Sequence, residues 1–145
     1  MSLTIFPAQP PIMTALIAGL LGLFFIRLAM KVIAARRAAK VSIGDSDDRA
    51  LLRASRVHAN FAEYVPLTLI LMALAENIGA PWFVILLLGV MLIAGRLLHA
   101  HGLGQEPDNF RARVRGMQLT IFALAGASAV ALIMAFMAIA RGIPA

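Results

Sequence analysis

Four long apolar stretches divide this chain, and short polar segments separate them. The stretches cover about residues 11–35, 51–75, 81–100 and 114–140. Each holds about 20 residues or more, enough for an α-helix to cross a hydrocarbon core ~30 Å thick. The pattern predicts an all-α integral membrane protein, a bundle of four transmembrane helices, with residues 1–145 forming a single membrane domain.

The composition agrees with this class. Of the 145 residues, 61% are hydrophobic and 14% are charged, whereas soluble domains are about half apolar and about a quarter charged. The chain has no cysteine, which excludes disulfides, thiolate metal sites and a cysteine nucleophile. Its three histidines have no carboxylate at ligand spacing, so no metal site is expected.

The basic residues gather at two of the three loops. The chain carries 13 lysines and arginines against seven acidic residues, a net charge of +6. Nucleic acid is not an expected partner, because no aromatic-rich basic surface accompanies these cations. The positive-inside rule assigns both basic loops to the cytoplasm and both termini to the opposite side. The first-loop group is Lys31, Arg36, Arg37, Lys40, Arg49, Arg53 and Arg56, and the third-loop group is Arg96, Arg111, Arg113 and Arg115.

The opposite side of the membrane carries little charge. Glu76, beside Asn77 and Gly79, is interpreted as a solvated residue of the second loop. The first apolar stretch has neither a basic leader nor an obvious cleavage site, so it is interpreted as a retained helix. Small residues favour close helix approach in the first and fourth stretches; they are Gly19, Gly22, Ala123, Gly126, Ala127 and Ser128.

A polar stripe begins the second stretch. Arg53, Arg56, Asn60 and Glu63 follow one another at three, four and three residues, which places them within an arc of roughly 80° on a helix. Charge at such a position is costly, and binding a ligand is one reason to retain it. Guanidinium groups suit carboxylates and Glu63 suits an ammonium, so the stripe favours a zwitterionic, peptide-like ligand. The alternative is a structural stripe in which Arg56 and Glu63 satisfy each other.

Other polar residues near this stripe have more than one possible role. Arginines end the first stretch and open the fourth, and they either anchor the helices or create a positive field that would bind an anion and lower the pKa of a bound thiol. Arg27 either reaches the membrane surface or pairs with Glu63. His58 points away from the stripe, toward a neighbouring helix or a second subunit.

Two motifs carry a resemblance to a known family. The segment VIAARRAAKV at residues 32–41 and the pattern Arg53-x-x-Arg56-x-x-x-Asn60-x-x-Glu63-Tyr64-x-Pro66 resemble the MAPEG family, the membrane-associated proteins of eicosanoid and glutathione metabolism. The resemblance implies a homotrimer of four-helix subunits, with glutathione bound between neighbours near the cytoplasmic face.

The resemblance also implies roles for individual residues. Arg113 matches the arginine that stabilises the glutathione thiolate, and Arg37 matches one that assists chemistry on the lipid substrate. His99 and Leu103 stand where leukotriene-forming members have tyrosines that help to bind glutathione. The residues expected to hold glutathione are Arg53, Arg56, Asn60, Glu63, Tyr64 and His99, with Arg36 and His58 supplied by the neighbouring subunit.

The resulting hypothesis is a glutathione-dependent membrane transferase or peroxidase acting on a lipophilic electrophile. Glutathione would be the co-substrate, without a metal, and the inner membrane of a bacterium is the expected location. The alternative is a non-catalytic scaffold that binds glutathione or an anionic lipid, which the missing tyrosines favour. A cation exporter is disfavoured, because Glu63 is its one candidate carboxylate and lies among arginines.

Overall fold

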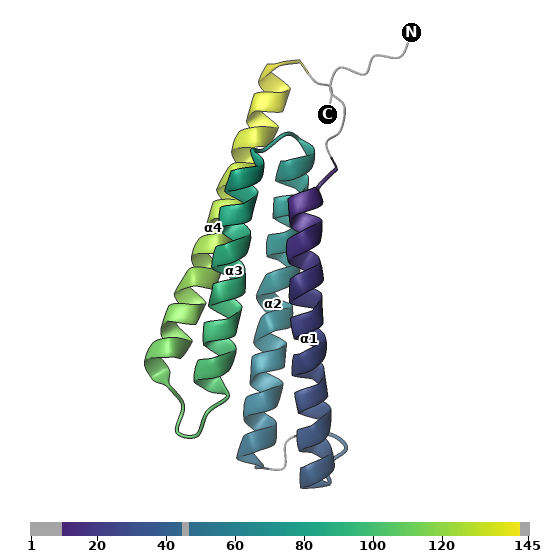
Figure 1. Ribbon diagram of the computed structural model, residues 1–145, viewed down its shortest axis with the longest axis vertical. Helices are drawn as coiled ribbons and strands as arrows, with labels where there is room; N and C mark the ends of the chain where they lie inside the picture. The colour runs from purple at the N-terminus through teal and green to yellow at the C-terminus, as the bar shows by residue number, and fades with distance from the viewer. Residues whose placement is uncertain (1–9, 45–46, 143–145) are drawn as a thin grey trace.

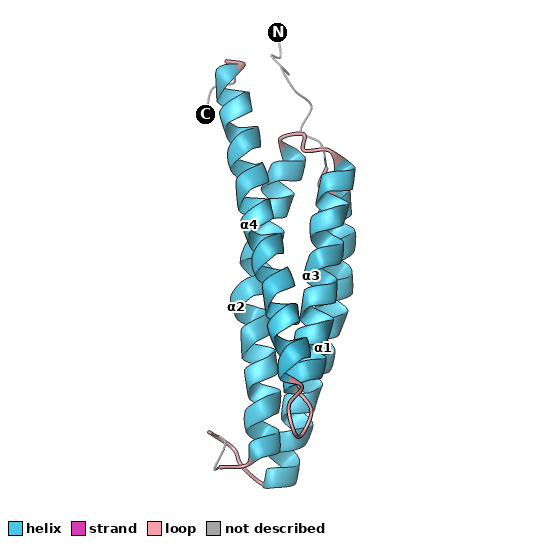
Figure 2. Cartoon of the chain, turned by 90° about the vertical axis from the view of Figure 1, so that its left-hand side faces the viewer, coloured by secondary structure: helices cyan, strands magenta, loops and turns pink. Residues whose placement is uncertain are grey.

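The computed structural model contains four α-helices and no strand among the residues it describes, 10–44 and 47–142. The helices are α1 (Ile12–Ala39), α2 (Arg49–Asn77), α3 (Trp82–Leu103) and α4 (Phe110–Ala140). They run side by side, and the α1–α2 and α3–α4 loops lie at one end while the α2–α3 turn lies at the other (Figures 1 and 2). All four are long and apolar enough to cross a membrane. The predicted all-α bundle is confirmed.

The helices extend beyond the predicted apolar stretches, mainly at the basic end. The carboxylate of Asp48 accepts a hydrogen bond from the Leu51 amide and starts α2 at Arg49. Asn109 accepts from the Ala112 amide and starts α4 at Phe110, four residues before the predicted start. Hydropathy underestimated these lengths because capped polar turns remain helical outside the hydrocarbon. The third loop is therefore limited to residues 104–109, and residues 45–46 of the first loop lie outside the described residues.

Small residues bring α3 and α4 together. A β-carbon at Gly116 would lie 2.7 Å from the carbonyl oxygen of Gly95 and 2.8 Å from Cα of His99. Ala123 and Ala127 are buried, as their predicted packing role requires. Gly19 and Gly22 were predicted to allow close helix approach. No helix of this chain packs closely on either glycine, because a β-carbon at either position would meet no atom within 4 Å.

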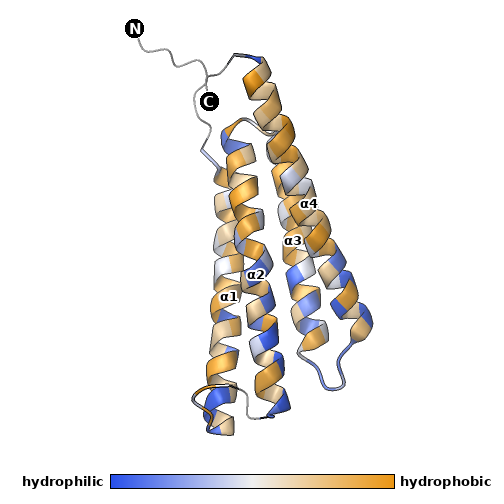
Figure 3. Ribbon diagram, turned by 180° about the vertical axis from the view of Figure 1, so that it is seen from behind, coloured by the Kyte–Doolittle hydropathy of each residue, from blue (hydrophilic) through white to orange (hydrophobic). Residues whose placement is uncertain are grey.

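Apolar side chains cover the outside of the bundle. Leu23, Phe122 and Phe136 are among the many large apolar residues that are exposed. The hydrophobic colouring covers most of each helix, and hydrophilic positions gather toward the end with the two basic loops (Figure 3). A surface of this kind is suited to contact with lipid tails.

Glu76 closes the opposite end of the bundle. Only 6% of its surface is exposed, and its carboxylate accepts hydrogen bonds from the Met13 amide, the Thr14 amide and the Thr14 hydroxyl at 2.9, 2.9 and 2.7 Å. Those amides belong to the first turn of α1 and have no partner within their own helix. The expectation of a solvated loop residue was wrong, because the partners of Glu76 lie more than 60 residues away in the sequence.

This contact predicts a stability defect. Glu76→Ala is expected to destabilise the protein by about 1–3 kcal/mol, because the buried donors of the first turn of α1 lose their acceptor. Thermal unfolding of the detergent-solubilised protein measures the change. The neighbouring Asn77 is exposed, so Asn77→Ala is the control, and equal effects of the two substitutions would contradict the capping role.

Candidate functional site

A pocket of about 320 Å³ lies between α2, α3 and α4, in the half of the bundle nearer the basic loops. Three helices contribute charged or hydrogen-bonding side chains to it. Arg56, Asn60 and Glu63 come from α2, His99 comes from α3 and Arg113 comes from α4; Ala59 and Leu103 complete the lining. Five of the residues predicted to bind glutathione or its thiolate are therefore brought together.

The helix geometry explains this convergence. Arg56, Asn60 and Glu63 are spaced by four and three residues and share one face of α2. On the other side, Gly102 of α3 packs against the start of α4, where a β-carbon would lie 2.8 Å from the Asn109 carbonyl oxygen. This close approach places Arg113, one turn into α4, at the edge of the pocket.

Arg96 lies in a different place from the one that its sequence context predicted. It was counted with the cations of the third loop, but α3 continues to Leu103, and Arg96 lies inside the bundle with 2% of its surface exposed. Its guanidinium donates to the Thr120 hydroxyl at 3.0 Å and to the side-chain oxygen of Asn60 at 2.8 Å. Among the described residues, no carboxylate forms an ion pair with it. A sequence signal existed: Arg96 precedes His99 by three residues and so shares its helix face.

Arg96 sets the orientation of Asn60. Because the side-chain oxygen of Asn60 accepts from Arg96, its amide N–H groups remain available as donors to a ligand. The same guanidinium lies 6.0 Å from the centre of the Tyr64 ring. Tyr64 does not line the pocket; it lies against Arg96, which holds the pocket's Asn60.

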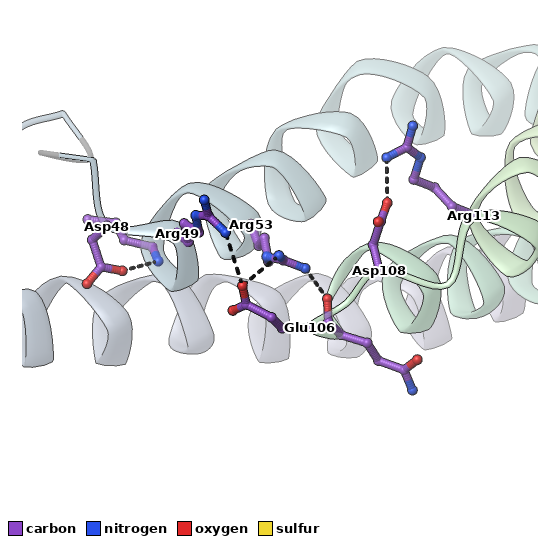
Figure 4. Close-up of polar contacts among 8 residues, drawn as sticks. Asp48, Arg49, Arg53, Glu106, Asp108 and Arg113 are labelled. Atoms are coloured by element: carbon purple, nitrogen blue, oxygen red, sulfur yellow. Dashed lines mark hydrogen bonds and ion pairs between the residues drawn. The ribbon is translucent and has the colours of Figure 1, made fainter.

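Arg113 is already engaged on one side. Its Nη1 lies 2.8 Å from a carboxylate oxygen of Asp108, and both side chains are 38% exposed (Figure 4). The guanidinium also lies 5.4 Å from the centre of the Phe110 ring. A guanidinium has five N–H donors, so Asp108 leaves donors of Arg113 free for a second anion.

His99 is buried at the pocket wall close to the backbone of Arg113, and within the described residues neither ring nitrogen makes a hydrogen bond of regular geometry. A buried polar group that lacks a partner costs about 1–3 kcal/mol. Such a cost is tolerated where a ligand supplies the missing partner. The imidazole therefore adds a hydrogen-bond donor or acceptor to the charged side chains of the pocket.

Arg53 leaves the stripe to which the sequence assigned it. Its guanidinium donates to the carbonyl oxygen of Gln105 and forms an ion pair with Glu106 at 3.1 Å (Figure 4). It lines a different cavity, on the α1 side of α2. Arg53 lies at the edge of the arc that the helical projection predicts. Sequence spacing could not show that Glu106 of the α3–α4 loop would pair with it.

The other predicted residues lie outside the pocket. His58 stacks on Phe25 of α1, with ring centres 4.5 Å apart, and so faces away from the stripe as predicted. Arg36 donates to the carbonyl oxygens of Ser42 and Gly44, and it lines an adjoining cavity of about 300 Å³ together with Arg56. Arg37 is exposed at the end of α1, and Arg27 is exposed within it and, in the described structure, forms no ion pair with Glu63.

The fold and the pocket define a four-helix membrane protein with a pocket lined by charged side chains near its basic end. Residues 14–138 match the model of the MAPEG family, and the chain belongs to that family. It is 35% identical over 111 residues to the "Inner membrane protein YecN" of Escherichia coli strain K12, and equally to that of Escherichia coli O6:H1. Each match covers 77% of this chain and 83% of the relative. The family is glutathione-related, and the relatives' name states a location without an activity.

Proposed function

We propose that this protein binds glutathione in the pocket between α2, α3 and α4 and presents the thiolate to a lipophilic electrophile. The observation that carries the proposal is the convergence of Arg56, Asn60, Glu63, His99 and Arg113 on one pocket. Glutathione has two carboxylates and one ammonium, and the pocket offers two guanidinium groups and one carboxylate. Arg56 would bind a carboxylate and Glu63 the ammonium, which leaves Arg113 for the thiolate.

The thiol chemistry would depend on Arg113. A cation beside the sulfur favours the thiolate, which is the nucleophilic form of a thiol. The thiolate adds to an activated carbon–carbon double bond, forming a thioether as the π bond breaks and the resulting carbanion takes a proton from water. Alternatively it attacks a hydroperoxide oxygen, forming an S–O bond as the O–O bond breaks. In the second case the departing alkoxide takes a proton from water, and a second glutathione converts the sulfenic acid to glutathione disulfide and water.

The proposal includes a homotrimer in the bacterial inner membrane, with both termini outside the cytoplasm. Two observations support the topology: the two basic loops lie at the same end of the bundle (Figure 1), and the YecN relatives are named inner membrane proteins. In such a trimer Arg36 and His58 would complete the site of the neighbouring subunit. Arg37, at the end of α1, would meet the lipophilic substrate, which enters from the bilayer.

A thiolate titration tests the proposal. Glutathione added to the detergent-solubilised protein at about pH 7 is expected to give thiolate absorbance at about 240 nm, and Arg113→Ala is expected to abolish it. Arg111→Ala is the matched control, because Arg111 is exposed two residues away and does not line the pocket. Equal signals from wild type and Arg113→Ala would contradict the role of Arg113.

The second candidate function is a scaffold that binds glutathione or an anionic lipid without turnover. Leu103 favours it, because this pocket residue offers no hydrogen bond where leukotriene-forming members have a tyrosine. Asp108 favours it too, because its carboxylate offsets part of the positive charge of Arg113. Binding of glutathione without a thiolate signal in the wild-type protein would support the scaffold and exclude the transferase.

A further inference from the structure

A second cavity, of about 170 Å³, lies on the other side of α2, between α1, α2 and the start of the α3–α4 loop. It shares no lining residue with the pocket proposed for glutathione. Leu28, Val57 and Ala100 form its apolar wall, whereas Lys31, Arg53 and Glu106 supply its charged groups. The cavity is thus apolar on one side and ionic on the other.

The ionic side has more positive than negative charge. One oxygen of Glu106 is shared by Arg53 at 3.1 Å and Arg49 at 3.7 Å (Figure 4). Lys31 also lines the cavity and forms no ion pair with any residue that the structure describes. The lining therefore carries two cations and one carboxylate, and a third cation, Arg49, pairs with that carboxylate. Because the side chain of Arg53 is only 22% exposed, its charge is poorly screened by water and attracts an anion.

The apolar side and the size of the cavity limit the kind of anion. Leu28 and Val57 are buried residues of the bundle core, so a fully hydrated ion would leave this wall uncovered. The volume equals that of roughly six water molecules, which accommodates a head group and the first methylenes of one chain. Glu106 already presents a carboxylate to Arg53 here, so the site is suited to that group.

We propose that this cavity binds the carboxylate end of a single-chain amphiphile, a fatty acid anion. Its carboxylate lies between Arg53 and Lys31, and its first methylenes lie against Leu28 and Val57. Glu106 holds Arg53 when the site is empty and competes with the ligand for it. This site is independent of the proposed glutathione chemistry, so either proposal can fail without the other.

Binding of dodecanoate tests this site directly. Dodecanoate labelled with ¹³C at its carboxyl is titrated into the full-length protein in phosphatidylcholine nanodiscs, and the carboxyl resonance distinguishes the protein-bound from the lipid-partitioned acid. Arg53→Gln is expected to weaken binding by about tenfold, because it removes a charge-assisted hydrogen bond. Glu106→Gln is expected to strengthen binding several-fold, because it removes the competing carboxylate.

Arg56→Gln is the matched control, since it makes the same charge change one turn along α2 and lines the other pocket. Ala54→Leu fills the cavity without touching an ion pair, and it is expected to block binding even if Arg53→Gln fails to fold. Equal weakening by Arg53→Gln and Arg56→Gln would overturn the proposal, as would weaker binding to Glu106→Gln. Displacement by phosphatidylglycerol, or equal binding of uncharged dodecanol, would overturn the choice of a single-chain carboxylate.

Discussion

Replacing Arg96 with methionine is expected to weaken glutathione binding by about tenfold, which corresponds to ~1.4 kcal/mol, while the helices remain folded. Arg96 is buried and donates to Asn60 and Thr120, so its loss frees the amide of Asn60 to rotate. Asn60 would then no longer present its N–H groups to a ligand. Calorimetric titration with glutathione measures the affinity, and thermal unfolding measures the stability.

The substitution is expected to change the stability of the protein little, because of the hydrogen-bond partners of Arg96. A buried cation whose partners are neutral oxygens gains little Coulomb energy against its desolvation. The two partners are not stranded by its loss, because the Thr120 hydroxyl also bonds the Gly116 carbonyl and Asn60 lines the pocket. We therefore expect a stability change of less than about 1 kcal/mol for Arg96→Met. Leu97→Met, at an exposed neighbouring position, is the control. Unfolding of Arg96→Met, or glutathione binding as tight as in the wild type, would contradict a positioning role.

The fold was predictable because the membrane simplifies the sequence. Four apolar stretches identified four helices, and the loops between them are too short for any neighbours other than antiparallel ones. The ends of the helices were less predictable. The caps formed by Asp48 and Asn109 lie in polar segments, where hydropathy carries no signal. Contacts between distant segments, such as Glu76 with Thr14, also leave no periodic pattern in the sequence.

The pocket was predictable where one helix sets the geometry. The spacing of Arg56, Asn60 and Glu63 alone places them on one face, and they line the same pocket. Arg53 has a matching spacing but does not line this pocket, because it pairs with Glu106 of the third loop. Arg96 was missed because the predicted third stretch ended at residue 100, which made an arginine near its end resemble a membrane anchor. The proposed roles of the pocket residues stay predictions.

Gly116→Ala is expected to destabilise the protein by about 1–3 kcal/mol, the usual cost of overpacking. The added β-carbon would lie 2.7 Å from the Gly95 carbonyl oxygen and 2.8 Å from Cα of His99, and neither backbone atom can move away by changing a rotamer. The clash would push α3 and α4 apart near His99 and Arg113. We therefore expect thermal unfolding to shift to lower temperature and the thiolate signal of bound glutathione to fall with it.

The control is a glycine with open space around it. Gly19 lies within α1 and a β-carbon there would meet nothing within 4 Å, so Gly19→Ala should stabilise the helix by about 0.5–1 kcal/mol through the lower entropy of the unfolded chain. The two substitutions add the same methyl group to helical glycines and are predicted to have opposite signs. If Gly116→Ala were neutral or stabilising, the close approach of α3 and α4 would not be what positions Arg113 beside His99.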